Sequence, residues 1–368
     1  MLKKLVNEAR FRLIITTTGP LLIKSGYDTV SGPNMAPVVT YRKDQDGTFT
    51  RQVFMPGSSL KGVFRSHLEK IICSIKPQVV CDPFWRPNER NDEQQNVQNR
   101  QIRERDYRIS CGDKFNKDQN DFKEQQKQRK RDNQLLLKDS ENPLGKTDMI
   151  YRDSCPACRL FGSTSFIGRV SIDDAYLVDA AKSRNERRDG VGIDRLTGGA
   201  SHGAKFELEV VSQGVEFATT ISLRNFEVWQ LGMLFVVVQD MEDKLIRIGS
   251  GRSRGLGSIT ARIDMQEHDG LAVGVTTSVI RNSQPEYQEP SNALWGLGKW
   301  LALDNNIAYG TFTDDFLTLA TPCQAEVKGV RNSRVFTGDA LGSLQSAAIE
   351  QFLMRMQNWE PQSAPVKV

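Results

Sequence analysis

Residues 155–163 read Cys-Pro-Ala-Cys-Arg-Leu-Phe-Gly-Ser, and they open with a Cys-x-x-Cys turn. Such a turn directs two thiolates to one side of the backbone, which suits a soft tetrahedral ion such as Zn²⁺. Besides Cys155 and Cys158, a four-cysteine site needs two more ligands, and Cys81 and Cys111 lie upstream. The sequence therefore predicts an excursion from the core that a structural zinc ion holds together. Buried thiols without a metal are the alternative.

The composition is that of a folded soluble protein with a mildly basic balance. The 368 residues give a net charge of +4 and a pI near 8.7, which permit an acidic partner without requiring one. No run of about 18 apolar residues is present, so no membrane partner is expected. The N-terminal pattern is unlike a signal peptide, which favours a reducing cytoplasm, where clustered cysteines indicate a metal rather than disulfides.

Hydrophobic periodicity predicts the order strand, helix, strand, strand, helix, strand. The predicted strands cover residues 9–18, 168–177, 205–211, 215–223 and 257–264, with a hairpin joining 205–211 to 215–223. The first predicted helix begins at Ser58 or Ser59, either of which can serve as an N-cap. The second predicted helix covers residues 226–240. This order is typical of an α+β, ferredoxin-like sheet with two helices on one side.

The sequence predicts one main domain over residues 1–275 and a C-terminal extension over 276–368. An insertion at 76–167 interrupts the main domain, and its charged part, 86–150, has few apolar residues. Such a stretch cannot bury enough surface to fold alone, so we expect it to be mobile or ordered only by partners. The extension ends in a predicted helix near 341–358, which can pack on the core or dock on a neighbour.

Two stretches have the residue types of an anion site. The loop that enters the first helix carries Ser58, Ser59, Lys61 and, one turn later, Arg65, beside the free amides of a helix start. An ordinary capped helix with a solvated lysine is the alternative. Residues 249–257 hold four glycines and two arginines, which together allow close approach to phosphates and bidentate contacts. That stretch matches neither a Walker loop nor a dinucleotide fingerprint, and a flexible turn is its alternative.

The stretch 187–200 is rich in small residues and holds apolar side chains between arginines. The apolar side chains are Val191, Ile193 and Leu196. Such a loop can wedge between bases while arginines hold the backbone. A long surface hairpin, in which Asp194 and Arg195 pair, is the alternative.

Catalytic signatures are scarce. None of His67, His202 and His268 lies in a catalytic-looking setting, although His67 is a possible substitute zinc ligand. Asp28 lies in an early loop just past a Gly-Pro break. A lone loop aspartate is usually a turn residue, but it can also hold a divalent metal or act on a ribose 2′-hydroxyl.

Taken together, residues 56–62, 155–163, 192–200 and 249–257 resemble, in this order, motifs of RAMP proteins, the backbone subunits of prokaryotic type III CRISPR effector complexes. The resemblance covers most of 9–265. It implies an RRM-like palm, a β-hairpin thumb at about 178–204 that kinks the guide–target duplex, and a zinc-bound excursion. It also implies binding of guide RNA (crRNA) and complementary target RNA within a complex of RAMP and other effector subunits.

The resemblance implies a set of RNA-binding residues in the palm and the thumb. These residues are Ser58, Ser59, Lys61, Arg65, Arg195, Thr197, Gly249, Gly251, Arg252 and Arg254. In such proteins phosphate contacts position the guide, and base pairing reads the target.

The family's cleaving members carry an aspartate between the first strand and the Pro-Gly-Ser-Ser helix. Here Asn34 stands at that place, and Asp28 lies six residues earlier. We favour the hypothesis that Asp28, with a divalent metal such as Mg²⁺, makes the subunit a target-RNA endoribonuclease, because the loop is long enough to bring it around. One alternative is a non-catalytic subunit of the same complex, since Asn cannot supply a base. Another is a stand-alone nuclease that processes precursor crRNA, against which the lack of a histidine cluster counts.

Overall fold

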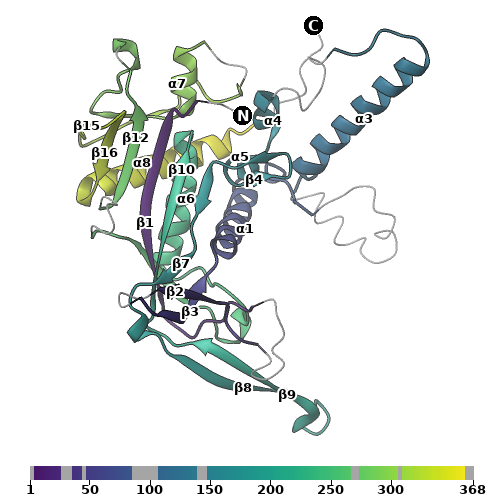
Figure 1. Cartoon of the computed structure of the whole chain (residues 1–368), viewed down its shortest axis with the longest axis vertical. Coiled ribbons are helices and arrows are strands. Elements are labelled where there is room, and N and C mark those ends of the chain that lie inside the picture. Colours follow the sequence, from purple (N-terminus) through teal and green to yellow (C-terminus); the bar gives the residue numbers. More distant parts are fainter. Residues whose placement is uncertain are drawn as a thin grey trace.

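The computed structural model describes residues 4–25, 35–43, 47–84, 107–138, 147–266, 273–282, 284–305 and 309–360. A large antiparallel sheet forms the body, and the hairpin β8–β9 and the helix α3 extend from it in different directions (Figure 1). The mixed α+β class predicted from the sequence is confirmed. Among the described residues, no helix combines the length and the apolar character needed to cross a membrane.

The large sheet contains β1 (Asn7–Thr17), β2 (Val39–Lys43), β3 (Phe49–Met55), β6 (Val170–Ile172), β7 (Ala175–Leu177), β10 (Glu216–Arg224), β11 (Ile259–Ile263), β12 (Val275–Ile280), β15 (Glu326–Lys328) and β16 (Arg331–Phe336). Smaller pairs are β4 (Gly162–Ser163) with β5 (Phe166–Ile167), β8 (Asn185–Ile193) with β9 (Ala200–Val211), and β13 (Ala293–Trp295) with β14 (Phe316–Thr318). The helices are α1 (Gly57–Ile75), α3 (Cys111–Arg131), α4 (Thr147–Asp153), α5 (Pro156–Phe161), α6 (Val228–Glu242), α7 (Leu297–Leu303) and α8 (Gly338–Gln357).

Strand β1 is the centre of the sheet. Its sequence alternates, so that Phe11, Leu13 and Ile15 are buried while Arg10 is exposed on the other face. One edge of β1 pairs with β10, and the other edge pairs with β11 and β12. Beyond β10 lie β6 and β7. The buried face of this sheet and the helices α1, α6 and α8 share one hydrophobic core.

Two predictions about strands need correction. The predicted strand 168–177 is broken at Asp173 and Asp174 into β6 and β7. The predicted hairpin between 205–211 and 215–223 is wrong, because β9 pairs with β8 and β10 pairs with β1. The hairpin that the structure does contain, β8–β9, therefore reaches to Val211, beyond the expected thumb at 178–204. The polarity pattern identified these strands, but pairing depends on partners far away in the sequence.

The segment after residue 275 is built into the same core. Strand β12 pairs with β1 from Asn7 opposite Val279 to Phe11 opposite Val275, and β16 pairs with β12. The last helix, α8, packs on α6, and its Phe352 is fully buried. Of the two possibilities expected for the last helix, packing on the core or docking on a neighbour, the structure contains packing on the core.

Helix α3 lies within residues 86–150, which the sequence predicted to be mobile or ordered only by partners. Its first turn is capped by Ser110, whose hydroxyl accepts a hydrogen bond from the Asp113 amide at 3.3 Å. Lys, Arg, Glu and Gln, which dominate the helix, have good helix propensity, and basic residues at its end suit the helix dipole. Residues 85–106 and 139–146 of this insertion lie outside the described part.

Candidate functional site

The four predicted cysteine ligands lie together. Cys81 follows α1, Cys111 begins α3, and Cys155 and Cys158 flank the start of α5. All four sulfur atoms lie within 4.8 Å of one another, and all four residues are buried. The Cys81 sulfur lies 3.5 Å from that of Cys158 and 3.6 Å from that of Cys155. A tetrahedral ion with Zn–S bonds of about 2.3 Å needs sulfur atoms about 3.8 Å apart, so the cluster fits a metal such as zinc.

Backbone amides and two arginines donate hydrogen bonds to these sulfur atoms. The amide of Cys155 donates to the Cys111 sulfur, and the amide of Cys158 donates to the Cys155 sulfur, each at 3.3 Å. Arg65 donates to the Cys158 sulfur at 3.4 Å, and Arg108 donates to the Cys111 sulfur at 3.5 Å. Because a zinc ion with four thiolates has a net charge of −2, the two guanidinium groups would offset the excess charge of such a site.

The position of Arg65 beside the cysteine sulfur atoms determines its pKa. Burial acts to lower its pKa, but the Cys158 thiolate and the Glu69 carboxylate raise it above the usual value. Arg65 also forms an ion pair with Glu69 at 2.8 Å and donates to the Gly162 carbonyl at 3.0 Å. The guanidinium thus joins α1 to the cysteine excursion. His67, the possible substitute ligand, lies outside the cluster and pairs with Asp240 at 2.6 Å.

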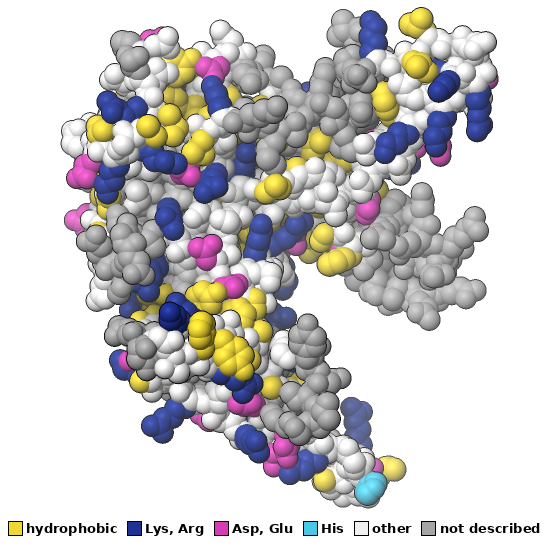
Figure 2. Space-filling model, viewed as in Figure 1, with side chains coloured by type: hydrophobic (Ala, Val, Ile, Leu, Met, Phe, Trp, Pro, Cys, Tyr) yellow, Lys and Arg dark blue, Asp and Glu magenta, His cyan; other side chains and the backbone are white. Residues whose placement is uncertain are grey.

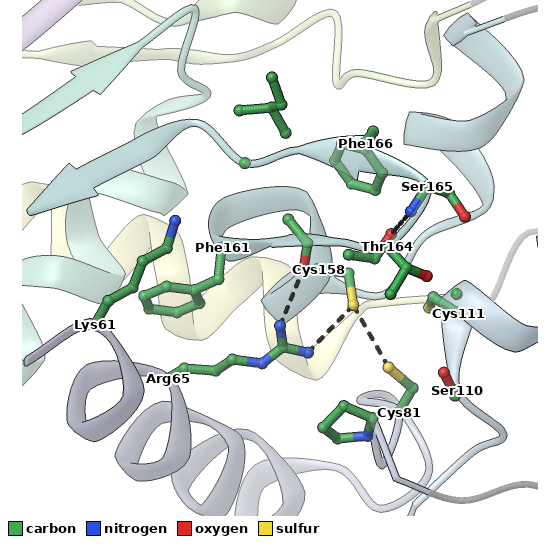
Figure 3. A pocket seen from close by; sticks show the side chains of 16 residues that line it. Lys61, Arg65, Cys81, Ser110, Cys111, Cys158, Phe161, Thr164, Ser165 and Phe166 are labelled. Carbon is green, nitrogen blue, oxygen red and sulfur yellow. Dashed lines mark hydrogen bonds between the residues drawn. The ribbon is translucent and has the colours of Figure 1, made fainter. Parts of the chain in front are cut away.

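A pocket of about 700 Å³ opens beside the cluster (Figure 3). The start of α3 and the β4–β5 turn form other parts of its lining. Lys61 and Arg65 reach into it from α1, and the lining includes Cys158, Phe161 and Ser165. Lys61 donates to the Val170 carbonyl at 3.1 Å. Burial, and then the nearby Arg65 charge, lower the Lys61 pKa.

The predicted N-cap role of Ser58 and Ser59 is wrong. The N-cap position is Pro56, and no side chain caps from that position. The Gly57 amide instead donates to the Asp174 carboxylate at 2.7 Å. Ser58 and Ser59 lie in the first turn of α1, where Ser58 is exposed and Ser59 is half-buried.

The glycine-rich stretch packs against the loop that follows β1. Gly249 has a φ of 83°, and a Cβ there would lie 2.3 Å from the Leu22 carbonyl oxygen, so only glycine fits. The Ser250 amide donates to Leu22 at 2.7 Å. Gly251 also has a positive φ, of 70°. Arg252 and Arg254, by contrast, are exposed.

The base of the β8–β9 hairpin meets this stretch. Leu22, Val210 and Leu256 form a small buried cluster, and Arg254 lies over the Phe206 ring at 5.8 Å. The loop after β1, the glycine-rich stretch and the hairpin base are therefore in contact. Lys61 and Arg65 lie instead beside the cysteine cluster.

The far end of the hairpin is exposed. Leu196 is 97% exposed, and Arg195 and Thr197 are exposed beside it. The Asp194 carboxylate accepts hydrogen bonds from the amides of Leu196 and Thr197, which lower its pKa, so its described partner is the turn backbone and not Arg195.

Asp28 and Asn34 lie outside the described residues. The residues on either side of this segment are described, and they lie together: the Ser25 amide donates to the Ala36 carbonyl at 3.0 Å, and Lys24 forms a bridge with Pro37. Met35 forms a bridge with Leu208 of β9. Both ends of the segment are therefore next to the hairpin base.

Sequence reasoning missed a buried polar network centred on Arg159. This side chain is 2% exposed and lies 3.6 Å from the fully buried Glu227 carboxylate. It donates to the carbonyls of Arg152 at 2.6 Å and Gly310 at 3.0 Å, and it stacks over Tyr151. Burial, and then the Glu227 charge, raise the Tyr151 pKa well above its usual value. The one sequence feature that could have indicated this network is the arginine directly after Cys158. The network joins the cysteine excursion to the C-terminal segment.

Comparison with known proteins agrees with the resemblance drawn from the motifs. The family model of the RAMP superfamily matches residues 14–260, about two thirds of the 368-residue chain. The match runs from β1 to β11 and includes the cysteine excursion, the β8–β9 hairpin and the glycine-rich stretch. No curated protein matches the chain.

Proposed function

This chain belongs to the RAMP superfamily, and we propose that it is a crRNA-binding backbone subunit of a type III CRISPR effector complex. One observation carries the proposal. The loop after β1, the glycine-rich stretch and the base of the β8–β9 hairpin are in contact through Leu22, Val210 and Leu256. Arg252 and Arg254 are exposed beside this junction. A glycine backbone with two exposed guanidinium groups is suited to hold the phosphates of a single strand.

The strand order supports an RRM-like palm. Reading across the sheet, β11, β1, β10 and then β6 with β7 are neighbours, all antiparallel. The chain passes through β1, α1, β6 with β7, β10, α6 and β11, which is the β-α-β-β-α-β order of ferredoxin-like domains. The β8–β9 hairpin takes the part of the thumb, and β12, β16 and α8 enlarge the palm.

The cysteine cluster takes a structural zinc ion in this proposal. Four buried thiolates leave no open position for a substrate, which is typical of structural rather than catalytic zinc. Cys81, Cys111 and the Cys155–Cys158 turn come from three separate segments, so the ion fixes the insertion against α1 and α5. Arg65 and Arg108 orient the sulfur atoms.

Within this proposal the guide has two separate contacts. Gly249, Gly251, Arg252 and Arg254 form one beside the hairpin base, and Ser58, Ser59 and Lys61 at the start of α1 form the other. Arg65 differs from them, because its nitrogen atoms already donate to Glu69, Gly162 and Cys158. At the thumb tip, Leu196 is the wedge, and Arg195 and Thr197 contact the adjacent backbone.

The test is to express the chain with its neighbouring effector genes, purify the complex and sequence the bound RNA. We expect a uniform set of short repeat-tagged RNAs. The variant Arg252→Gln with Arg254→Gln should retain less of this RNA, while the matched control Arg281→Gln with Lys328→Gln should retain all of it. A complex that carries only random RNA fragments, or none, contradicts the proposal.

Target-RNA cleavage through Asp28 is the second candidate function. The observation that favours it is the position of Ser25 and Met35, the described residues on either side of residues 26–34. They lie beside the hairpin base, where the proposed RNA path runs. A carboxylate in this segment, with Mg²⁺, would accept the proton of a target 2′-hydroxyl as its oxygen attacks the adjacent phosphate. The P–O5′ bond would break, leaving a 2′,3′-cyclic phosphate on one product and a 5′-hydroxyl, protonated by water, on the other. A non-catalytic subunit, with Asn34 at the family's aspartate position, and a stand-alone crRNA-processing nuclease are the alternatives.

A further inference from the structure

Helix α3 gathers its cations on one face. At 100° per residue, the exposed cations of its outer part fall within an arc of about 140°. These cations are Lys117, Lys123, Lys127, Lys130 and Arg131. From Lys117 to Arg131 this arc holds one carboxylate, that of Glu124, and within the described residues none of the five cations forms an ion pair. Over the 15 residues from Lys117 to Arg131, the face extends about 21 Å.

The opposite face of α3 is already covered. Phe115 is buried, and Phe122 is half-buried. Gln126 exchanges two hydrogen bonds with the Leu137 backbone, at 2.7 and 3.0 Å, and Arg129 donates to the Leu135 carbonyl at 3.1 Å. The segment that returns from the helix therefore packs along this side, and the basic face remains exposed.

The root of α3 is fixed by the cysteine cluster. Its first residue is Cys111, whose sulfur lies among the other three. Arg108, just before the helix, donates to the Asp153 carbonyl at 2.9 Å. A Cβ on the buried Gly112 would lie 2.3 Å from the Thr164 hydroxyl oxygen, so the first turn packs tightly on the β4–β5 turn. From this root the helix projects from the body, and Lys and Arg side chains follow its length (Figures 1 and 2).

We propose that α3 is a metal-anchored arm whose basic face, Lys117 to Arg131, binds the phosphate backbone of RNA that runs beside the subunit. This inference rests on the proposed function. A helix that is polar on nearly all sides has no reason to bury itself in a core, and cations gathered on one exposed face attract an anionic partner. Four of the five cations are lysines, which act as point charges on phosphates and do not read bases.

The chemistry of this face favours RNA over an acidic protein. Lysine is depleted at protein–protein interfaces, where aromatic side chains and arginine supply most of the binding energy. The basic face contains no aromatic residue, because Phe115 and Phe122 are on the covered side. Binding should therefore be insensitive to sequence and strongly dependent on salt.

The experiment measures the affinity of the full-length chain for a labelled 40-nucleotide single-stranded RNA over a series of salt concentrations. The variant is Lys123→Gln with Lys127→Gln, which keeps good helix formers. For single strands the logarithm of the binding constant falls with the logarithm of salt by about 0.7 per phosphate contact. Loss of two contacts should therefore reduce the slope by about 1.4 and weaken binding about 20-fold at 0.1 M salt.

Two controls separate charge from folding. Arg281→Gln with Lys328→Gln removes two exposed cations elsewhere and should leave the slope unchanged. Lys123→Arg with Lys127→Arg keeps the charges and should bind as the unaltered chain does. Circular dichroism should report the same helix content in all variants.

The outcomes distinguish this inference from the function on which it rests. If the unaltered chain binds the RNA and the Lys123→Gln/Lys127→Gln variant binds with the same slope, the arm is not an RNA contact, while the proposed function stands. If that variant keeps its RNA affinity but loses a partner subunit during purification, the arm binds protein and the inference is wrong. If the unaltered chain does not bind RNA even at low salt, both proposals fail.

Discussion

The guanidinium of Arg65 donates a hydrogen bond to the Cys158 sulfur at 3.4 Å, so the helix α1 supports the cysteine cluster directly. The same side chain holds Glu69 and the Gly162 carbonyl. Arg65 belongs to the motif from which an RNA contact was predicted, yet its described contacts are all within the protein. This relationship leads to a prediction that separates the two roles.

Replacing Arg65 by Gln should weaken metal binding more than RNA binding. The Cys158 sulfur loses a charged donor, and loss of such an outer partner typically lowers metal affinity by about 10- to 100-fold. Competition with a zinc chelator measures this effect. Lys61→Gln, on the same helix but without a sulfur contact, is the matched control for zinc. If Arg65→Gln keeps its zinc affinity and loses crRNA, Arg65 is an RNA contact after all.

Removing one ligand should release the insertion. In Cys155→Ser the zinc content should fall from about one ion per chain, and α3 should exchange amide hydrogens faster because its first residue is no longer fixed. Cys73→Ser is the control, since Cys73 is outside the cluster. Elemental analysis and hydrogen exchange measure the two effects. Undamaged protein that never contains a metal would leave only packed thiols.

The cysteine cluster shows what a sequence pattern can predict. The Cys-x-x-Cys spacing of Cys155 and Cys158 is encoded locally, and Cys81 and Cys111 lie in the same insertion, so the sequence predicted the four cysteines that the structure brings together. Strand β1 was also found, because alternation of Arg10 with Phe11 and its neighbours depends only on burial. The β8–β9 pairing was missed, since a strand's partner is set by contacts distant in sequence.

Other features depend on tertiary contacts that no local pattern reveals. The composition of α3 predicts disorder, but the helix begins at Cys111, which lies within the cysteine cluster, and it is capped by Ser110. Arg159 resembles a surface cation in sequence, and only its burial against Glu227 identifies it as structural. Asp28 stays a prediction, because it lies outside the described residues.

The close packing of α8 on α6 predicts opposite effects for two glycine substitutions. A Cβ at Gly232 would lie 2.0 Å from the Ala348 carbonyl oxygen, whereas Gly342 in α8 has open space around it. Gly232→Ala should destabilise the protein by about 2 kcal/mol or more, as overpacking does. Gly342→Ala should stabilise it by about 0.5–1 kcal/mol through helix propensity. Denaturant unfolding measures both, and equal effects would mean that α8 is not packed as described.

Glu289 predicts a pH dependence of stability. Burial raises its pKa to about 7, although the Arg334 charge, 3.1 Å away, acts in the opposite direction. The unfolded carboxyl has a pKa of about 4.3, so the folded state holds the proton more tightly. The resulting stability is fully present below about pH 4.3 and is lost as the pH rises through about 7. Thermal unfolding at pH 5 and pH 8 measures the loss.

The matched variant for this prediction is Glu289→Gln, which cannot titrate. Its free energy of unfolding should change less than that of the unaltered chain between pH 5 and pH 8. Glu286→Gln, an exposed neighbour, should behave like the unaltered chain. The same pH dependence in Glu289→Gln would assign the titration to another group.

The cleavage hypothesis leads to the sharpest comparison between two residues. In the assembled complex, Asp28→Ala should abolish cutting of guide-matched RNA opposite this subunit while RNA affinity is unchanged, because a metal-bound carboxylate acts on the reacting phosphate and not on the guide. Asn34→Ala should leave cleavage intact, and chelation of Mg²⁺ should stop it in the unaltered complex.

Restoring the family's residue by Asn34→Asp in the Asp28→Ala background tests the alternative. If only that variant cuts, the natural subunit is structural and its catalytic position has been lost. A cleavage map with no cut opposite this subunit in the unaltered complex would lead to the same conclusion.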